Sequence, residues 1–172
     1  MIEDNVILVD VHDNQIGLMP KLEAHEKGVL HRAFSVFIFN NHGELMLQRR
    51  ALTKYHSPGL WTNTCCSHQR DGESNISSGK RRLKEEMGFD TELFEKTSFI
   101  YKAKFDNGLI EHEFDHVLVG SYNHSPIINS IEVDSWKWMS LENVKKDIND
   151  HPDNYTAWFK IIFEKYYKYI SQ

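Results

Sequence analysis

The stretch GESNISSGKRRLKEEMGF, residues 72–89, decides the fold of this chain. It predicts a helix over residues 76–87, because its apolar residues recur at the spacing of one helix face. Ser74 or Asn75 can cap the start through a side-chain oxygen, and Gly88 can end the helix in a left-handed conformation. The apolar residues on that face are Ile76, Leu83 and Met87.

Strand and turn signals surround this helix. Asn40–Gly43 and Asp106–Gly108 are typical of hairpin turns. Segments rich in β-branched or aromatic residues are predicted as strands: residues 6–9, 33–39, 44–49, 98–105, 110–120 and 136–139. Two more helices are expected at residues 141–148 and 153–170. Helices mixed with strands that are mostly joined by hairpins predict an α+β fold, with a mixed sheet flanked by helices.

Length and composition limit the classes of function. The 172 residues favour one domain spanning residues 1–172, and the net charge of -5 argues against nucleic acid as the main partner. The sequence has no apolar run long enough to cross a membrane, and its first residues lack the pattern of a signal peptide. Its two cysteines are adjacent, so we expect free thiols and a cytoplasmic protein.

Histidines and glutamates provide a candidate metal site. In a strand the side chains alternate, so Glu111 and Glu113 would face one side and His112 the other. With three histidines these carboxylates would suit Mn²⁺ or Zn²⁺. The five candidate ligands are His25, His31, His68, Glu111 and Glu113. Spacing alone does not show that they converge, and a Glu-x-Glu pair is also typical of a solvated strand face.

A thiol and several cations add to this chemistry. Cys66 lies two residues before His68, which suggests either a metal-ligand pair or a reactive thiol beside a ligand. Arginine can hold phosphate oxygens through a bidentate fork, and lysine supplies a point charge. The candidate phosphate-binding residues are Lys21, Arg50, Lys54 and Arg82. Taken one by one they are equally typical of ordinary surface charges.

The segment from Ser67 to Phe89 resembles the Nudix signature in its spacing. Two positions depart from that signature, because Ser67 replaces its first glycine and Arg82 replaces an acid of the helix. Nudix hydrolases use glutamates of this helix to hold metal ions that activate water. A salt-bridged surface helix would explain the charges but not the spacing of Glu73 and Gly88.

The chain as a whole resembles type I isopentenyl-diphosphate isomerase, a branch of the Nudix fold, from Val6 to Trp158. The residues that carry the resemblance are Lys21-x-x-x-His25, Leu30-His31-x-Ala33-Phe34-Ser35, Arg49-Arg50-Ala51-Leu52-x-Lys54, Pro58-Gly59-x-Trp61-Thr62-Asn63-x-x-Cys66-x-His68, Gly72-Glu73-Ser74, Arg81-Arg82 with Glu86 and Gly88, Glu111-x-Glu113, and Trp158. Many separate motifs in the same order make the match specific.

The resemblance implies a role for each candidate. The three histidines with Glu111 and Glu113 would hold one Mn²⁺ or Zn²⁺, and Glu86 would hold a Mg²⁺ bound with the substrate diphosphate. The four cations named above, together with the Trp158 ring, would contact the substrate. The residues implied to be catalytic are Cys66, Glu113 and Tyr101. Cys65 receives no role.

The implied reaction moves the double bond of isopentenyl diphosphate to give dimethylallyl diphosphate through a tertiary carbocation. The hypothesis assigns proton delivery to Glu113 and Tyr101 and proton removal to a Cys66 thiolate, and the reverse assignment stays open. The rings of Trp158 and Trp61 could stabilise the cation, although core packing is an equal interpretation for Trp61. The aromatic last helix is a candidate lid that excludes water.

Two other functions compete with isomerisation. A Nudix diphosphate hydrolase would share the helix, although Arg82 and the Cys66-x-His68 pair speak against it. A metal-binding regulatory module would need no catalysis at all. The sequence leaves the identity of the metal open, and it allows a monomer or a homodimer.

Overall fold

The computed structural model describes residues 4–171 of the chain. Within that range nine strands form one sheet: β1 (Asn5–Val9), β2 (Gln15–Pro20), β3 (His31–Phe39), β4 (Glu44–Arg50), β5 (Trp61–Thr62), β6 (Cys65–Ser67), β7 (Leu93–Lys104), β8 (Ile110–Ser121) and β9 (Val133–Ser140). The helices of the same range are α1 (Lys21–Lys27), α2 (Asn75–Met87), α3 (Leu141–Asp150), the short 3₁₀ helix η1 (Pro152–Asn154) and α4 (Ala157–Ile170). None of these helices is long and apolar enough to cross a membrane.

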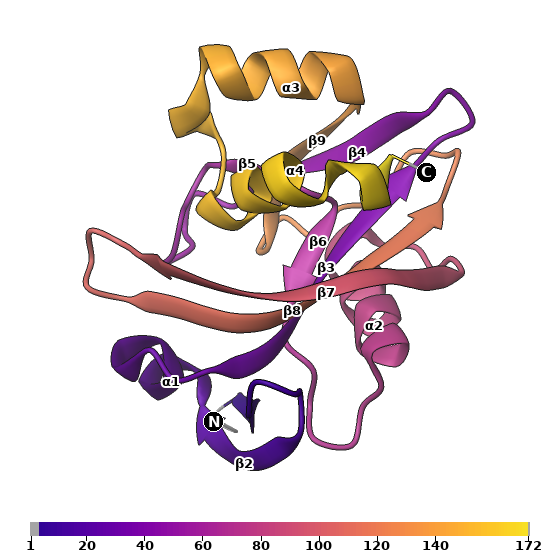
Figure 1. Ribbon diagram of the computed structural model, residues 1–172. Coiled ribbons are helices and arrows are strands. Elements are labelled where there is room, and N and C mark those ends of the chain that lie inside the picture. Colours follow the sequence, from indigo (N-terminus) through magenta and orange to yellow (C-terminus); the bar gives the residue numbers. More distant parts are fainter. Residues whose placement is uncertain (1–3, 172) are drawn as a thin grey trace.

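The central strand β3 organises the sheet (Figure 1). It pairs antiparallel with β1, β4 and β6 and parallel with β8, and β8 in turn pairs with β7. β9 continues the sheet beyond β4. Parallel and antiparallel pairs in one sheet, with helices packed against it, confirm the predicted α+β fold with a mixed sheet.

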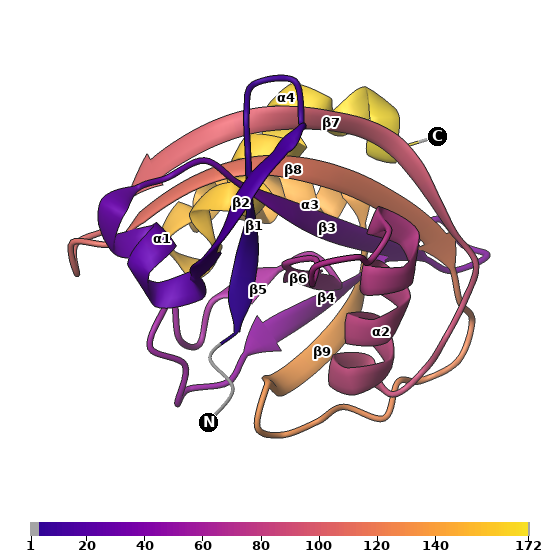
Figure 2. The same ribbon diagram turned by 90° about the horizontal axis from the view of Figure 1, so that it is seen from below.

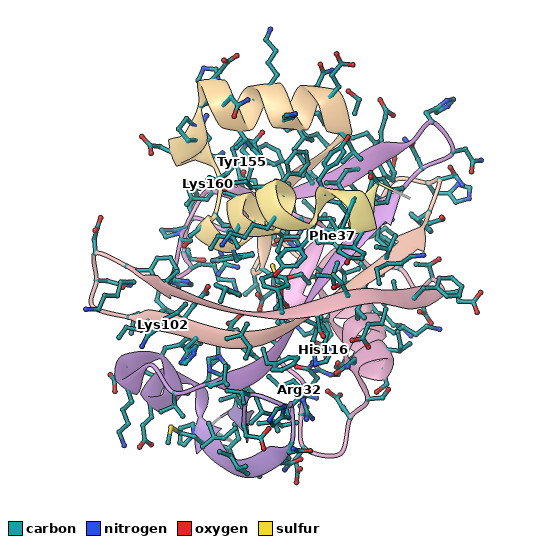
Figure 3. All side chains as sticks on the ribbon, viewed as in Figure 1. Arg32, Phe37, Lys102, His116, Tyr155 and Lys160 are labelled. Atoms are coloured by element: carbon teal, nitrogen blue, oxygen red, sulfur yellow. The ribbon has the colours of Figure 1, made fainter. Side chains whose placement is uncertain are left out.

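Alternation along the strands divides the core into two layers. Phe37 contacts the cluster that contains Trp158 and Phe159 of α4, whereas its neighbour Val36 belongs to the cluster around Leu83 of α2. Figure 2 shows α2 and α4 on opposite faces of the sheet, and Figure 3 places Phe37 on the α4 side. Successive side chains of a strand point to opposite faces, so β3 contributes side chains to both layers of the core.

The helix α2 forms as its sequence predicts. The Ser74 hydroxyl accepts a hydrogen bond from the Ser77 amide, and Gly88 ends the helix at a φ of 74°. A Cβ atom on Gly79 would lie 2.7 Å from Cδ1 of Leu118. The glycine therefore lets the middle of α2 approach the sheet closely.

The start predicted for the last helix was wrong. α4 begins at Ala157 rather than Asp153, because Tyr155 and Thr156 are extended and bind the β5 region. Tyr155 bridges to Trp61, and the Thr156 amide donates to the Trp61 carbonyl at 3.0 Å. Backbone groups that bond a neighbouring strand cannot also bond within a helix.

Candidate active site

The strand register places three predicted site residues side by side. His31 on β3 pairs with Glu113 on β8, and Glu113 pairs with Tyr101 on β7. On the other edge of β3, Ser35 pairs with Cys66 of β6. Neighbouring strands lie about 4.8 Å apart, so paired residues on one face are within side-chain reach. Backbone pairing alone therefore gathers an imidazole, a carboxylate and a phenol.

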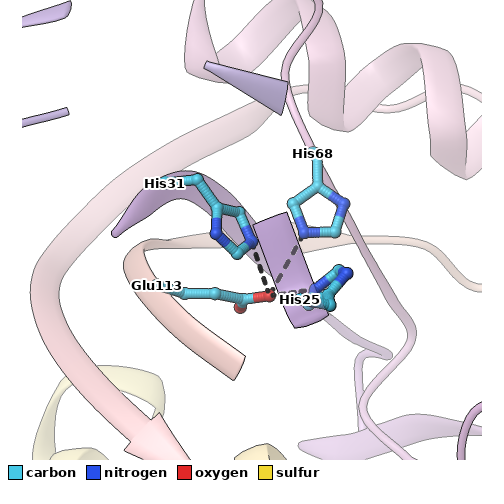
Figure 4. A group of neighbouring side chains, drawn as sticks. All are labelled: His25, His31, His68 and Glu113. Atoms are coloured by element: carbon cyan, nitrogen blue, oxygen red, sulfur yellow. Dashed lines mark hydrogen bonds and ion pairs between the residues drawn. The ribbon is translucent and has the colours of Figure 1, made fainter. Parts of the chain in front are cut away.

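The first functional group is a metal-ligand set that we name the His₃Glu cluster, shown in Figure 4. Around Oε1 of Glu113 the Nε2 atoms lie at 3.1 Å for His68, 3.5 Å for His31 and 3.9 Å for His25. All the ligand atoms lie within 4.8 Å of one another. Ligands that each lie about 2.0–2.2 Å from one ion adopt mutual distances of this size. The members of the cluster are His25, His31, His68 and Glu113.

Unpartnered nitrogens show that this cluster fits a metal ion. Both ring nitrogens of His25 and Nε2 of His31 are buried without a hydrogen-bond partner. Nδ1 of His31 lies 2.8 Å from the carbonyl of Val29, which can accept its proton, so the neutral ring would present an Nε2 lone pair to a metal ion in the cluster. Buried polar atoms are normally paired. A divalent ion in the cluster would bind one of these nitrogens from each ring.

The charges in the cluster also favour a cation. Burial alone would raise the pKa of Glu113, but its contacts with the three imidazoles outweigh burial and hold that pKa well below its ordinary value. Burial lowers the pKa of His68 to about 3, so this ring is neutral at pH 7. An ionised carboxylate beside three imidazole rings is the donor set that Zn²⁺ or Mn²⁺ prefers.

Glu111 lies beside the His₃Glu cluster rather than within it. Its Oε2 accepts a hydrogen bond from the Tyr101 hydroxyl at 2.8 Å, and the same hydroxyl lies 2.7 Å from Oε2 of Glu113. Its Oε1 lies 2.9 Å from Nε2 of His56. Burial and the charge of Glu113 raise the pKa of Glu111 to about 8. Glu111 as a fifth ligand stays a prediction.

The second functional group is the Cys66 thiol. The indole N–H of Trp158 donates to its Sγ at 3.0 Å, and the thiol donates to Oδ1 of Asn63 at 3.5 Å. Burial raises the pKa of Cys66 to about 12, so the thiol is protonated at neutral pH. A protonated sulfur between one donor and one acceptor has a fixed orientation.

The third functional group is a cationic wall. Lys21 comes from α1, Arg50 and Lys54 from the end of β4 and its following loop, and Arg82 from α2. Burial, followed by the charges of Lys54, Arg50 and Arg82, lowers the pKa of Lys21. Four cations that line one pocket would suit a compact anion with more than one charge.

The carboxylate of Glu86 lies next to the cationic wall, in contact with Arg82. Its Oε1 accepts from Nη2 of Arg82 at 2.9 Å, and its Oε2 accepts from the Cys65 thiol at 2.7 Å and from Nε2 of Gln48 at 3.4 Å. Cys65 is buried in the α2 layer, opposite its neighbour Cys66. The Arg82–Glu86 contact confirms that these residues share one helix face.

One pocket joins the three groups. All the predicted site residues line it except His31, which is fully buried behind Glu113. Trp61 does not line the pocket: it packs against the core with Nζ of Lys137 4.1 Å over its ring. Packing was therefore the right interpretation of Trp61.

The sequence interpretation assigned no site role to four residues that line the pocket: Ser35, Tyr55, His56 and Ser67. The Ser35 hydroxyl donates to the buried Asp115 carboxyl at 2.8 Å. Tyr55 and His56 follow Lys54 directly, so adjacency to a predicted phosphate-binding residue was the available signal. That signal could not identify Glu111 as the partner of His56.

Comparisons with known proteins agree with this chemistry. The model of the NUDIX domain family matches residues 29–159. An isopentenyl-diphosphate Delta-isomerase 2 of Aromatoleum aromaticum is 51% identical over 95% of this chain and 86% of its own. A protein of the same name from Photorhabdus laumondii is 54% identical over 93% of this chain and 90% of its own.

Solved structures agree with the fold. A crystal structure of a protein from Deinococcus radiodurans gives a TM-score of 0.76 at 17% identity, covering 94% of this chain and 99% of that one. A MutT protein from Methanosarcina mazei gives 0.66 at 19% identity, covering 81% and 94%. These likenesses concern the fold alone. The family match and the sequence relatives show more: this chain belongs to the NUDIX domain family and, within it, to the isopentenyl-diphosphate Delta-isomerases.

Proposed function

We propose that this pocket converts isopentenyl diphosphate into dimethylallyl diphosphate by adding a proton to the terminal alkene carbon, C4, and removing one from C2. The observation that carries the proposal is that Cys66 and the Tyr101–Glu113 pair line one pocket beside the His₃Glu cluster. Isomerisation needs two proton-transferring groups, one for each carbon, whereas hydrolysis needs an activated water. A thiol and a phenol–carboxylate pair supply those two groups.

The two groups differ in what surrounds them. Cys66 is held between Asn63 and Trp158, whereas the Tyr101 hydroxyl lies within hydrogen-bond distance of both carboxylates of β8. A divalent ion in the cluster would raise the acidity of the groups that it contacts. The finer assignment stays a prediction: Glu113 and Tyr101 deliver the proton and a Cys66 thiolate removes one, or the roles are reversed, which the protonated Cys66 thiol would suit.

The diphosphate would bind the cationic wall. Arg50 and Arg82 can each present two N–H groups to phosphate oxygens, and Lys21 and Lys54 add point charges. Glu86 lies beside Arg82 and would supply a carboxylate oxygen to a Mg²⁺ that is bound with the diphosphate. This arrangement points the hydrocarbon end of the substrate toward Cys66 and Tyr101.

The Trp158 ring would stabilise the tertiary cation. Cζ of Arg50 lies 5.3 Å from the centre of this ring, so the ring already accepts a cation. Attraction of a cation to a desolvated indole contributes about 2 kcal/mol. Trp158 is the residue that α4 contributes to the pocket lining, and through it this helix would help to keep water from the cation.

The test incubates the purified protein with isopentenyl diphosphate and Mg²⁺ in deuterated water. We expect dimethylallyl diphosphate with deuterium at C4, and exchange at C2. Cys66→Ala should lower kcat by at least about a hundredfold, because general acid–base groups contribute that much. Its metal content should remain that of the wild type, whereas Glu113→Gln should lose both turnover and metal.

Other outcomes would identify the competing functions. Release of phosphate from nucleoside diphosphate derivatives, without isomerisation, would indicate a hydrolase. Metal binding without any turnover, unaffected by Cys66→Ala, would indicate a regulatory module. The cytoplasmic location and the choice between monomer and homodimer stay predictions from the sequence.

A further inference from the structure

His56 is a pocket residue to which the proposed reaction assigns no task. It lies in the loop between β4 and β5, and its side chain is 12% exposed. Its Nε2 atom lies 2.9 Å from Oε1 of Glu111, a residue of β8 that is distant in sequence. The contact therefore connects this loop to the carboxylate beside the His₃Glu cluster.

The direction of this hydrogen bond follows from the chemistry of the carboxylate. Bound to a metal ion, Glu111 would be an ionised carboxylate that only accepts, so Nε2 of His56 would carry the proton and donate. The Tyr101 hydroxyl occupies one position on the other oxygen, Oε2. Each carboxylate oxygen accepts up to two hydrogen bonds. Both contacts together still leave Glu111 able to bind a metal ion.

The imidazole of His56 is itself held in one place. It stacks on Trp158 at a centroid distance of 5.6 Å and an angle of 24°, and it meets the edge of Phe105 at 4.3 Å and 90°. Its backbone carbonyl accepts from Nε and Nη2 of Arg50 at 3.2 and 3.0 Å. A ring fixed by aromatic contacts and through its backbone can orient a partner with little loss of freedom.

We propose that His56 is a positioning residue of the metal site: its imidazole N–H orients the Glu111 carboxylate toward the ion that the His₃Glu cluster binds. The inference rests on the proposed function only in placing an ion in the His₃Glu cluster, and it takes Glu111 as a further ligand of that ion. Partners that hydrogen-bond to metal ligands typically change metal affinity by 10–100-fold when removed. His56 also joins the two sides of the pocket, because Arg50 of the cationic wall holds its carbonyl.

The test measures Zn²⁺ affinity of the full-length, metal-free protein by competition with a chromophoric chelator, without substrate. His56→Phe keeps the aromatic contacts but removes the N–H group, and we expect a 10–100-fold weaker affinity. His56→Gln restores an N–H donor and should recover most of the loss. The control is His42→Gln in the exposed β3–β4 turn, which should bind Zn²⁺ as the wild type does.

A double-mutant cycle separates positioning from general damage. If His56 acts through Glu111, His56→Phe should cost little further affinity once Glu111→Gln is present. Additive losses, an unchanged affinity in His56→Phe, or a tighter affinity would each overturn the proposal, the last because His56 would then compete with the ion for Glu111. Turnover is not part of this measurement, so a protein without isomerase activity would contradict the proposed function and leave the affinities interpretable.

Discussion

At the scale of single residues, a buried hydrogen-bond chain orients the Cys66 thiol. Nδ2 of Asn63 donates to the carbonyls of Val36 and Cys65 at 3.1 and 2.9 Å, so its Oδ1 must be the atom that faces Thr62 and Cys66. Thr62 donates to that oxygen at 2.8 Å and accepts from the Thr156 hydroxyl at 3.0 Å. The chain thereby links the start of α4 to the pocket.

Thr62→Val should destabilise the protein more than Thr62→Ser. Thr62 is fully buried, and the valine would leave the Thr156 hydroxyl without an acceptor and deprive Asn63 of its nearer donor. An unsatisfied buried polar group costs about 1–3 kcal/mol. Serine keeps the hydroxyl and loses one methyl group, about 0.8 kcal/mol. Urea unfolding of both variants measures the difference, and equal losses would contradict a role for the hydroxyl.

The sequence predicts a place in the site for residues that stand in motifs, but not for residues whose place depends only on contacts in the folded chain. Cys66, His68 and Glu113 stand in spacings that carry chemical meaning, and the structure places them together. His56 has no such spacing, because its partner Glu111 comes from a strand on the far side of α2 in the sequence. Long-range pairing of this kind depends on strand register, which a single sequence specifies only through its fold.

At the scale of elements, the end of α2 depends on a glycine. Gly88 has a φ of 74°, and a Cβ atom there would lie 2.3 Å from the carbonyl oxygen of Ile127. Gly43 has a φ of 73° in a turn where a Cβ atom would meet nothing within 4 Å. The two positions therefore share the left-handed conformation but not the steric conflict.

Gly88→Ala should lower the free energy of unfolding more than Gly43→Ala. The left-handed conformation costs an alanine about 1–2 kcal/mol at either position. Displacing the Ile127 backbone should add roughly 1–3 kcal/mol at Gly88 alone. Denaturant unfolding of the two variants measures the difference between their free energies of unfolding, which isolates the cost of displacing Ile127. Equal losses of stability would show that the segment around Ile127 moves aside freely.

A contact between α3 and the segment before α4 should make stability depend on pH. The Tyr155 hydroxyl donates to the Asp147 carboxylate, and this bond lowers the pKa of Asp147. A lowered folded-state pKa stabilises the fold above the ordinary aspartate pKa near 3.9, and the contribution disappears as the pH falls through the folded-state value. Tyr155→Phe should therefore be less stable than wild type at pH 7, with the gap narrowing toward pH 3. A stability difference between Tyr155→Phe and wild type that stays constant from pH 7 to pH 3 would show that it does not come from the ionisation of Asp147.

The predicted helices and hairpins agree with the structure where the local sequence signals are strong. The helix expected over residues 76–87 and the hairpin around Asp106–Gly108 both formed. α1 was missed because a helix of two turns gives too short a periodic pattern. α1 brings Lys21 and His25 to the pocket, so the missed element is one that positions the site.

At the scale of the whole molecule, metal binding should stabilise the fold. The His₃Glu cluster joins α1, β3, the end of β6 and β8, which lie apart in the unfolded chain. A ligand at a hundred times its Kd adds about 2.7 kcal/mol to the folded state. Zn²⁺ should therefore raise the Tm of the metal-free wild type and leave that of Glu113→Gln nearly unchanged. Mg²⁺ at the same concentration should have little effect, since imidazole is a poor ligand for it.

The parallel pairing of β3 with β8 has a consequence for synthesis on the ribosome. β3 emerges early, but its partner strand at residues 110–121 leaves the exit tunnel only after α2 and β7. Until then the nascent chain holds three histidines without the carboxylate that completes the cluster. Non-local strand pairing is slow to form. The growing polypeptide should therefore acquire its ion late, when most of the chain has been translated.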